Sequence, residues 1–204
     1  MPQPIKVYFW PTPNGAKIAI LLEELSLPYE VTPIDIGAGA QFEPGFLAVS
    51  PNNKIPAIHD PEAGVSVFES GAILNYLAGK AGRFLGDDAK SRIAVQEWLF
   101  WQVGGFGPML GQLGHFKKAS EAIPYAISRY SDETRRLYGV LEKRLIGRDF
   151  VAGDYSIADI AIYPWAKNWQ RHDVDPKDHP NVAAWRDRVA TRPAVLAAYQ
   201  RHMN

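Results

Sequence analysis

The sequence predicts a small α/β domain followed by a larger all-helical domain. Two observations support this fold class. Residues 1–80 alternate between strand-like and helix-like patterns, and the strand patterns stop beyond residue 87. The connecting segment, Gly79 to Asp87, contains three glycines and few large apolar residues. We therefore expect one domain over residues 1–80 and a second over residues 88–204.

The first strand and helix of the α/β domain are indicated by a change of period. Residues 5–10 are rich in β-branched and aromatic side chains, as a buried strand requires. Residues 11–15, Pro-Thr-Pro-Asn-Gly, break the strand. Apolar residues then recur at helical spacing, at Ile18, Leu21, Leu22 and Leu25.

The remaining elements of this domain complete the order β-α-β-α-β-β-α, which implies a mixed sheet with helices packed on it. They are a strand over 29–36, a Gly-rich turn over 37–40, a short helical piece over 46–48, strands over 55–59 and 65–68, and a helix that Ser70 caps. The two short strands are joined by a turn through Pro61 and Gly64.

The second domain shows helical patterns only, over residues 89–103, 125–145, 157–170 and 182–189. Ser156 and Asp159 have the spacing of a capping box, with Asp in place of the usual Glu or Gln. Pro124 and Pro193 stand where first-turn prolines are expected, because the first turn of a helix has no use for the missing N–H.

The composition excludes several classes of function. Lys plus Arg equals Asp plus Glu at 22 each, so a net charge of zero gives no general attraction to nucleic acid or to an anionic membrane. The absence of cysteine excludes disulfides, thiolate metal sites and a protein thiol nucleophile. No two of the five histidines have the spacing of a zinc site, and we expect no metal.

The same observations bear on where the protein works. A chain without cysteine fits a reducing cytoplasm. The N-terminal Met-Pro-Gln-Pro lacks the charged and apolar regions of a signal peptide, and no apolar run approaches the length of a membrane span. We expect a cytoplasmic protein with neither nucleic-acid nor membrane partners.

The order of elements, with Ile55-Pro56 entering the third strand and an all-α domain behind it, resembles the cytosolic glutathione transferases over essentially the whole chain. Six stretches are similar to the bacterial nu class, which is related to the yeast nitrogen-regulator type of protein: residues 12–15, 41–42, 50–58, 68–73, 99–105 and 108–112. The resemblance implies a thioredoxin-like first domain, a homodimer, and glutathione-dependent disulfide reduction.

The resemblance implies a glutathione site on the first domain. Ile55-Pro56 occupies the family's cis-proline position, where the Ile55 backbone pairs with the cysteinyl backbone of the peptide. The Ser70 hydroxyl and the helix N-terminus suit the γ-glutamyl carboxylate, Glu69 suits the ammonium, and Lys54 can reach the glycyl carboxylate. Further hydrogen bonds to the tripeptide are expected from Gln41 and Asn53. Without the resemblance, these residues also fit a turn proline, a helix cap, a solvated lysine and two polar loop residues.

Thr12 and Asn14 stand where other classes place a catalytic Tyr, Ser or Cys. Both lie at the start of the first helix, where the dipole favours an anion and lowers the pKa of a thiol. The Thr12 hydroxyl and the Asn14 amide would donate hydrogen bonds to the glutathione sulfur. The alternative is that Thr-Pro-Asn-Gly only terminates the loop before the helix.

The second domain contributes two further expectations. In the nu class an arginine at the position of Arg129 reaches the glutathione site from the partner subunit, and the alternative for Arg129 is a surface charge. Phe106, Met109 and Leu110 follow a break at Gly104-Gly105, and we expect them to wall a pocket for the second substrate.

The expected function is an enzyme that uses the thiol of reduced glutathione because it has none of its own, and that also holds oxidised glutathione. Its substrates would be small disulfides or electrophiles, with glutathione peroxidase activity as a side reaction. Two alternatives remain open. One is a transferase-like binding or regulatory protein with little turnover, and the other is a detoxifying transferase.

Overall fold

The computed structural model describes residues 3–203, which form two compact units. The first unit contains residues 3–83 together with 192–203, and the second contains residues 84–191. The predicted fold class is confirmed, because a mixed α/β unit precedes helical segments. The domain limits 1–80 and 88–204 stay a prediction, since contacts group the last helix, α9 (Pro193–His202), with the first unit.

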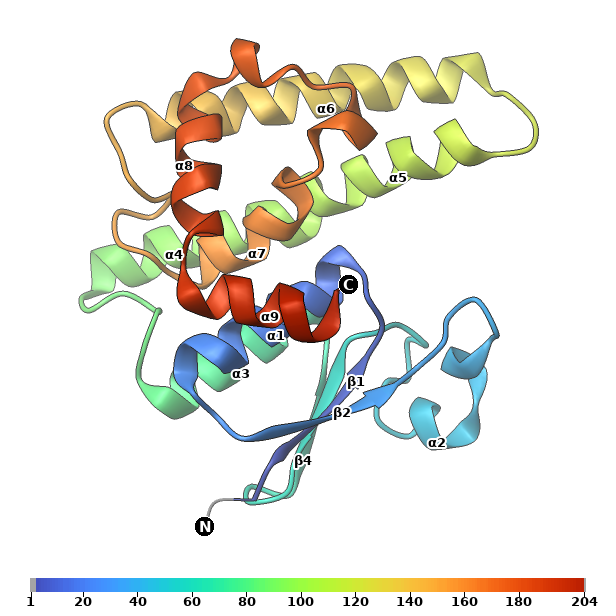
Figure 1. Ribbon diagram of the computed structural model, residues 1–204, viewed down its shortest axis with the longest axis vertical. Helices are drawn as coiled ribbons and strands as arrows, with labels where there is room; N and C mark the ends of the chain where they lie inside the picture. Colours follow the sequence, from blue (N-terminus) through green and yellow to red (C-terminus); the bar gives the residue numbers. More distant parts are fainter. Residues whose placement is uncertain (1–2, 204) are drawn as a thin grey trace. The chain divides into compact units, whose positions relative to one another are not determined.

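The first unit contains a four-stranded sheet of order β2-β1-β3-β4 (Figure 1). Its strands are β1 (Ile5–Phe9), β2 (Tyr29–Pro33), β3 (Ala57–Asp60) and β4 (Val65–Phe68). β1 is parallel to β2 and antiparallel to β3, and β3 is antiparallel to β4. The sheet is therefore mixed, as the predicted order of elements implies.

Helix α1 (Pro13–Leu25) is the centre of the first unit. It packs against α3 (Ser70–Ala81) and α9, and the short α2 (Pro44–Leu47) follows β2. Residues 18–22 of α1 are all buried, because this run has no polar side chain and is covered on more than one side.

Two ion pairs join α9 and the residue before it to the C-terminal end of α1. Arg192 donates to both carboxylate oxygens of Glu24 at 2.6 and 2.9 Å, and Arg201 donates to Glu23 at 2.7 Å. The paired geometry at Glu24 is the stronger kind of charge-assisted contact. These contacts explain why a helix from the end of the sequence belongs to the first unit.

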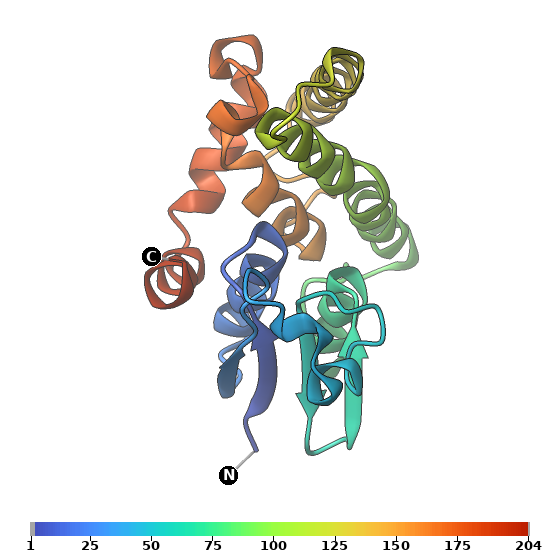
Figure 2. The same cartoon turned by 90° about the vertical axis from the view of Figure 1, so that its right-hand side faces the viewer.

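The second unit consists of helices. The main ones are α4 (Ala89–Trp101), α5 (Gly107–Lys118), α6 (Pro124–Leu145), α7 (Ile157–Ala166) and α8 (Pro180–Ala190). Two short 3₁₀ helices, Trp169–His172 and Pro176–Asp178, join α7 to α8. Helices α5 and α6 lie side by side, as Figure 2 shows in green and yellow.

The break expected at Gly104-Gly105 is wrong. Residues 102–106 continue the chain as a π-helical turn from α4 directly into α5. The close packing lies at the next glycine, because a Cβ atom at Gly107 would lie 2.5 Å from the Gln102 amide nitrogen and 3.2 Å from the Trp165 indole nitrogen, whereas one at Gly104 would meet nothing within 4 Å. Helix α5 was not predicted, because its sequence is rich in glycine and lacks strong helical periodicity.

The capping box predicted at Ser156 and Asp159 is confirmed at the start of α7. The Ser156 hydroxyl accepts from the Ala158 N–H, and the Asp159 carboxylate accepts from the Ser156 N–H at 3.1 Å. Asp159 is fully buried and also accepts from the Val151 N–H and from the Trp185 indole, each at 2.9 Å. One carboxylate thus joins a loop, a helix start and α8.

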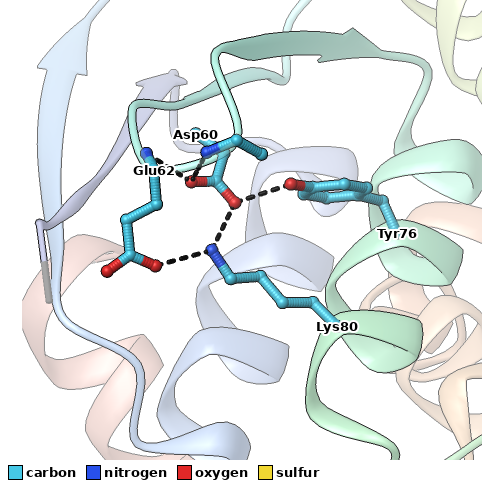
Figure 3. Close-up of polar contacts among 5 residues, drawn as sticks. Asp60, Glu62, Tyr76 and Lys80 are labelled. Atoms are coloured by element: carbon cyan, nitrogen blue, oxygen red, sulfur yellow. Dashed lines mark hydrogen bonds and ion pairs between the residues drawn. The ribbon is translucent and has the colours of Figure 1, made fainter.

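A buried carboxylate also closes the turn between β3 and β4 (Figure 3). Asp60 has no exposed surface and accepts from Lys80 at 2.5 Å and from the Tyr76 hydroxyl at 2.6 Å. Its other oxygen accepts from the N–H groups of Glu62 and Ala63. The cluster therefore joins the hairpin turn to α3.

We expect this cluster to make stability depend on pH in acid. Burial alone would raise the pKa of Asp60, but the hydrogen bonds from Lys80 and Tyr76 outweigh it and lower the pKa to about 2. A carboxylate with a depressed pKa contributes stability that is present above its unfolded pKa, near 3.8, and is lost as pH falls towards about 2. The expected decrease in the free energy of unfolding over this pH range is on the order of 2 kcal/mol.

Denaturant unfolding at a series of acid pH values measures this effect. Asp60→Asn should be less stable than the wild type near neutral pH and should show a shallower loss between about pH 4 and about pH 2. Glu62→Gln is the matched control, because the Glu62 side chain is 41% exposed and pairs with the same Lys80. Equal acid profiles for the wild type and Asp60→Asn would contradict the assignment.

Candidate active site

A pocket of about 150 Å³ lies in the first unit, where three segments of chain meet. The segments are the start of α1, the loop before β3 and the junction of β4 with α3. The lining residues are Asn14, Lys54, Ile55, Pro56, Phe68, Glu69 and Ser70. Six of the predicted site residues are thus brought together, and Phe68 is the one lining residue that was not predicted as part of the site.

The start of α1 carries the two residues expected to hold a sulfur. Thr12 is the N-cap residue, and its hydroxyl oxygen accepts from the Gly15 N–H at 3.1 Å. Asn14 lies in the first turn of the helix and lines the pocket, whereas Thr12 does not line it. Gly15 is required here, since a Cβ atom would come within 2.4 Å of the Trp10 carbonyl oxygen.

The loop before β3 presents a lysine and a turned backbone. The buried Ser50 hydroxyl donates to the Lys54 carbonyl at 2.8 Å, which holds the loop closed. The peptide bond between Ile55 and Pro56 is cis, as predicted. Lys54 is exposed, and so its ammonium can meet a ligand from solvent.

The junction of β4 with α3 differs from the sequence prediction in one respect. Ser70 was expected to cap α3, but the N-cap residue is Glu69, and Ser70 is the first helical residue. Glu69 has a φ of 70°, a conformation that non-glycine residues rarely adopt and that is concentrated at functional sites. Asn52, which the sequence analysis did not single out, donates to the Glu69 carboxylate at 3.4 Å.

Lys17 is a further residue of this region that was not predicted from the sequence. It lies in the second turn of α1 with 1% of its surface exposed, and its ammonium donates to the Ser70 hydroxyl at 3.1 Å. Burial lowers the pKa of Lys17 from 10.5 to about 7, against the charge of Glu69, which raises it. The sequence feature that could have identified Lys17 is its position directly before the apolar residues 18–22 of the same helix.

Two predicted residues of the first unit do not line the pocket. Asn53 has a left-handed backbone with a φ of 48°, and its N–H donates to the Ser50 carbonyl at 2.9 Å. Gln41 lies in the short 3₁₀ helix Ala40–Phe42, and its buried side-chain oxygen has no hydrogen-bond partner among the described residues. An acceptor of this kind can still receive a bond from a ligand.

The residues predicted from the helical domain are divided by burial. Phe106 and Leu110 are 0% and 1% exposed, so the expectation that they wall a substrate pocket is not met in this structure. Phe106 stacks on Trp101 with ring centroids 5.0 Å apart, which is a core contact. Met109 and Arg129 line a groove of about 530 Å³ on α5 and α6, together with Tyr125, Ser128, Tyr130, Asp132, Glu133 and Arg136.

Neither a metal site nor a membrane-spanning helix is found in the part of the chain that the structure describes. Within residues 3–203, no three His, Asp or Glu side chains are grouped so that they could hold a metal ion. No helix in that range is both long enough and apolar enough to cross a membrane.

Family models match both halves of the chain. The model for the glutathione S-transferase N-terminal domain matches residues 3–79, and the model for the C-terminal domain matches residues 126–193. The chain belongs to the glutathione S-transferase family, as the resemblance indicated. It is 54% identical to the disulfide-bond oxidoreductase YfcG of Escherichia coli, over 94% of this chain and 92% of YfcG.

Solved structures of bacterial relatives agree with this assignment. A glutathione transferase of Burkholderia graminis, with two glutathione molecules bound per subunit, has a TM-score of 0.91 and 42% identity over 97% of this chain and 88% of that chain. One of Pseudomonas putida, with one glutathione disulfide bound per subunit, has a TM-score of 0.89 and 40% identity over 97% of this chain and 91% of that chain.

Proposed function

We propose that this chain is a glutathione-dependent disulfide-bond reductase whose thiol is supplied by glutathione bound in the first-unit pocket. One observation carries the proposal. The pocket combines a carboxylate, an ammonium, a helix N-terminus and a turned backbone segment, from Glu69, Lys54, α3 and Ile55-Pro56. These groups correspond to the charged ends and the peptide backbone of glutathione.

The γ-glutamyl end of glutathione fits the junction of β4 with α3. Its carboxylate suits the Ser70 hydroxyl and the start of α3, where N–H groups and the helix dipole favour an anion. Its ammonium suits the Glu69 carboxylate, which Asn52 also contacts. A pocket of about 150 Å³ is below the roughly 300–1,000 Å³ of whole-ligand sites, which fits a tripeptide that is only partly enclosed.

The rest of the tripeptide lies along the exposed loop. Its cysteinyl backbone pairs with the Ile55 backbone in the manner of an added strand, and its glycyl carboxylate meets Lys54. Gln41 and Asn53 are proposed as further hydrogen-bond partners, and the buried oxygen of Gln41 is an acceptor open to such a bond.

The thiol end fits the start of α1. The Thr12 oxygen accepts the capping bond from Gly15, and the hydroxyl still has its own hydrogen to donate to a sulfur. The Asn14 amide lines the same pocket and can donate a second bond. Capping and thiolate binding are therefore compatible roles for Thr12.

The proposed reaction has two exchange steps. The bound glutathione thiolate attacks one sulfur of the substrate disulfide, forming a mixed disulfide and releasing a thiolate, which takes up a proton. A second glutathione thiolate attacks the glutathione sulfur of the mixed disulfide, forming oxidised glutathione and releasing the second substrate thiolate. The two molecules in the Burkholderia graminis structure and the disulfide in the Pseudomonas putida structure correspond to the glutathione consumed and produced.

The same thiolate supports related chemistry. Attack on a hydroperoxide would give peroxidase activity, and attack on an electrophilic carbon would give conventional transfer.

We also propose that the protein is a cytoplasmic homodimer, with the groove on α5 and α6 around Arg129 as the contact surface for a second copy. The exposed Tyr125, with 78% of its surface accessible, lines that groove.

The experiment that tests the proposal combines binding with turnover. Reduced and oxidised glutathione are titrated into the protein by calorimetry, and reduction of a small dialkyl disulfide is compared with conjugation of a chlorinated nitroaromatic. Binding of both forms and faster disulfide reduction are expected. The absence of binding would overturn the proposal, binding without turnover would favour a regulatory protein, and faster conjugation would favour a detoxifying transferase.

We expect Glu69→Ala and Ser70→Ala each to weaken glutathione binding by about tenfold to a hundredfold. Each variant removes a hydrogen bond to a charged group, a contact worth roughly 1.5–3 kcal/mol. Calorimetric dissociation constants measure the effect, with thermal unfolding as the check on folding. Glu30→Ala on the exposed face of β2 is a control that should leave affinity unchanged. Unchanged affinity in both site variants would place the γ-glutamyl end elsewhere.

A further inference from the structure

Lys17 is a buried charged residue that the proposed reaction does not use. Of the lysines in residues 3–203, it alone is buried, with 1% of its surface exposed. Lysine is almost never fully buried unless it is paired, because the ammonium loses its hydration. A lysine in this position therefore requires a local group that offsets the lost hydration.

The surroundings of Lys17 point to the proposed γ-glutamyl end of the pocket. The Lys17 ammonium donates to the Ser70 hydroxyl at 3.1 Å in a buried contact between α1 and α3. Ser70 itself lines the pocket beside Glu69. The ammonium thus lies directly behind the hydroxyl that we assign to the γ-glutamyl carboxylate.

The contact sets the direction of the Ser70 hydroxyl hydrogen. An ammonium has donors only, so the Ser70 oxygen accepts from Lys17 and keeps its own hydrogen for another acceptor. A neutral amine has a lone pair, which can accept that hydrogen and turn it away from the pocket. The charge on Lys17 therefore favours a hydroxyl that donates to a bound anion.

The other charged groups on the elements that pack against α1 are engaged elsewhere. On α9, Arg192 and Arg201 pair with Glu24 and Glu23 at the far end of α1. His202 of α9 contacts the Tyr29 hydroxyl at 2.7 Å and the Phe9 ring. On α3, Lys80 pairs with Asp60 and Glu62. The charge of Glu69 raises the pKa of Lys17.

We propose that Lys17 is a positioning residue of the glutathione site, which holds the Ser70 hydroxyl towards the γ-glutamyl carboxylate and takes up a proton when that carboxylate binds. The proposal rests on the proposed function, because it places this carboxylate at Ser70. It adds a coupling between glutathione affinity and pH that does not involve the thiol.

The direction of the coupling follows from the state of Lys17 in the ligand-free protein. With a pKa of about 7, the ammonium is about half protonated near neutral pH. A carboxylate bound at Ser70 adds a negative charge nearby and favours the protonated form. Binding therefore takes up about half a proton near pH 7, and affinity falls as pH rises above that value.

Calorimetric titration with S-methylglutathione tests the proposal, because this ligand has no ionisable thiol. Titrations in buffers of different ionisation enthalpy, from about pH 6 to about pH 8.5, give the number of protons taken up on binding. The wild type should take up about half a proton near pH 7. Lys17→Met should lose that uptake and bind about tenfold more weakly or worse.

Two further variants separate position from charge. Lys17→Arg keeps a permanent charge and should bind without the uptake seen in the wild type. Lys54→Met removes the exposed lysine of the same pocket and should weaken binding while the proton uptake persists. Binding by the wild type without uptake, or equal uptake in Lys17→Met, would overturn the inference and leave the proposed function standing. Failure of the wild type to bind at any pH would instead overturn the proposed function.

Discussion

Replacing Asp159 by alanine is expected to lower the free energy of unfolding by about 3–5 kcal/mol. The variant leaves the Val151 N–H, the Ser156 N–H and the Trp185 indole N–H without their acceptor, and each unsatisfied buried donor costs about 1–3 kcal/mol. Burial raises the pKa of Asp159 to about 6 although these donors lower it, so the group is ionised at neutral pH.

Urea unfolding at neutral pH measures the effect. Asp159→Asn retains one acceptor oxygen and should lie between the wild type and Asp159→Ala. Asp149→Ala is the matched control, because the Asp149 side chain is 71% exposed and its ion pair with Arg188 contributes at most about 1 kcal/mol. If Asp159→Ala were as stable as Asp149→Ala, the buried network would not be a main source of stability.

Asn14→Ala and Thr12→Val are each expected to slow disulfide reduction by about tenfold to a hundredfold. Each removes a proposed donor to the glutathione thiolate, and a hydrogen bond to a charged group is worth about 1.5–3 kcal/mol. The two effects need not add, because both donors act on one sulfur. Thr12→Val also loses the helix cap, at a cost of about 1 kcal/mol in stability.

The pH profile of turnover distinguishes thiolate binding from capping. Both variants should raise the apparent pKa of the bound thiol, since a lost donor favours the protonated form. Thr12→Ser restores a hydroxyl that can both cap α1 and donate, and it should return close to the wild-type rate. A rate and a thiol pKa unchanged in Asn14→Ala and Thr12→Val would make these residues loop and cap residues only.

Several parts of the candidate site were predictable because they depend on neighbouring residues. Ile55-Pro56 before a strand, Glu69-Ser70 before a helix and Thr12 with Asn14 at a helix start are short motifs. The cap at Thr12 follows from N-cap chemistry, whereas the cis bond at Ile55-Pro56 was implied by the resemblance, since most X–Pro bonds are trans. The capping box at Ser156 and Asp159 is local in the same sense, and it was predicted correctly. The resemblance to a family supplied their link to glutathione.

The order of the elements was also determined locally, by apolar periodicity and by the breaks between segments. In the strands, apolar and polar residues alternate or apolar residues follow one another over a few positions. Apolar residues recur at helical spacing in α1, α3, α4, α6, α7 and α8. Where glycines weakened that repeat, as in α5, periodicity failed and the helix was missed.

Only the tertiary structure decided which distant groups meet. Lys17 and Ser70 are 53 residues apart, and no pattern within α1 shows that its lysine lies behind the start of α3. The docking of α9 on α1 and the burial of Phe106 and Leu110 were likewise beyond sequence analysis. Local patterns specify which face of a segment avoids water, whereas the partner of that face depends on how the whole chain packs.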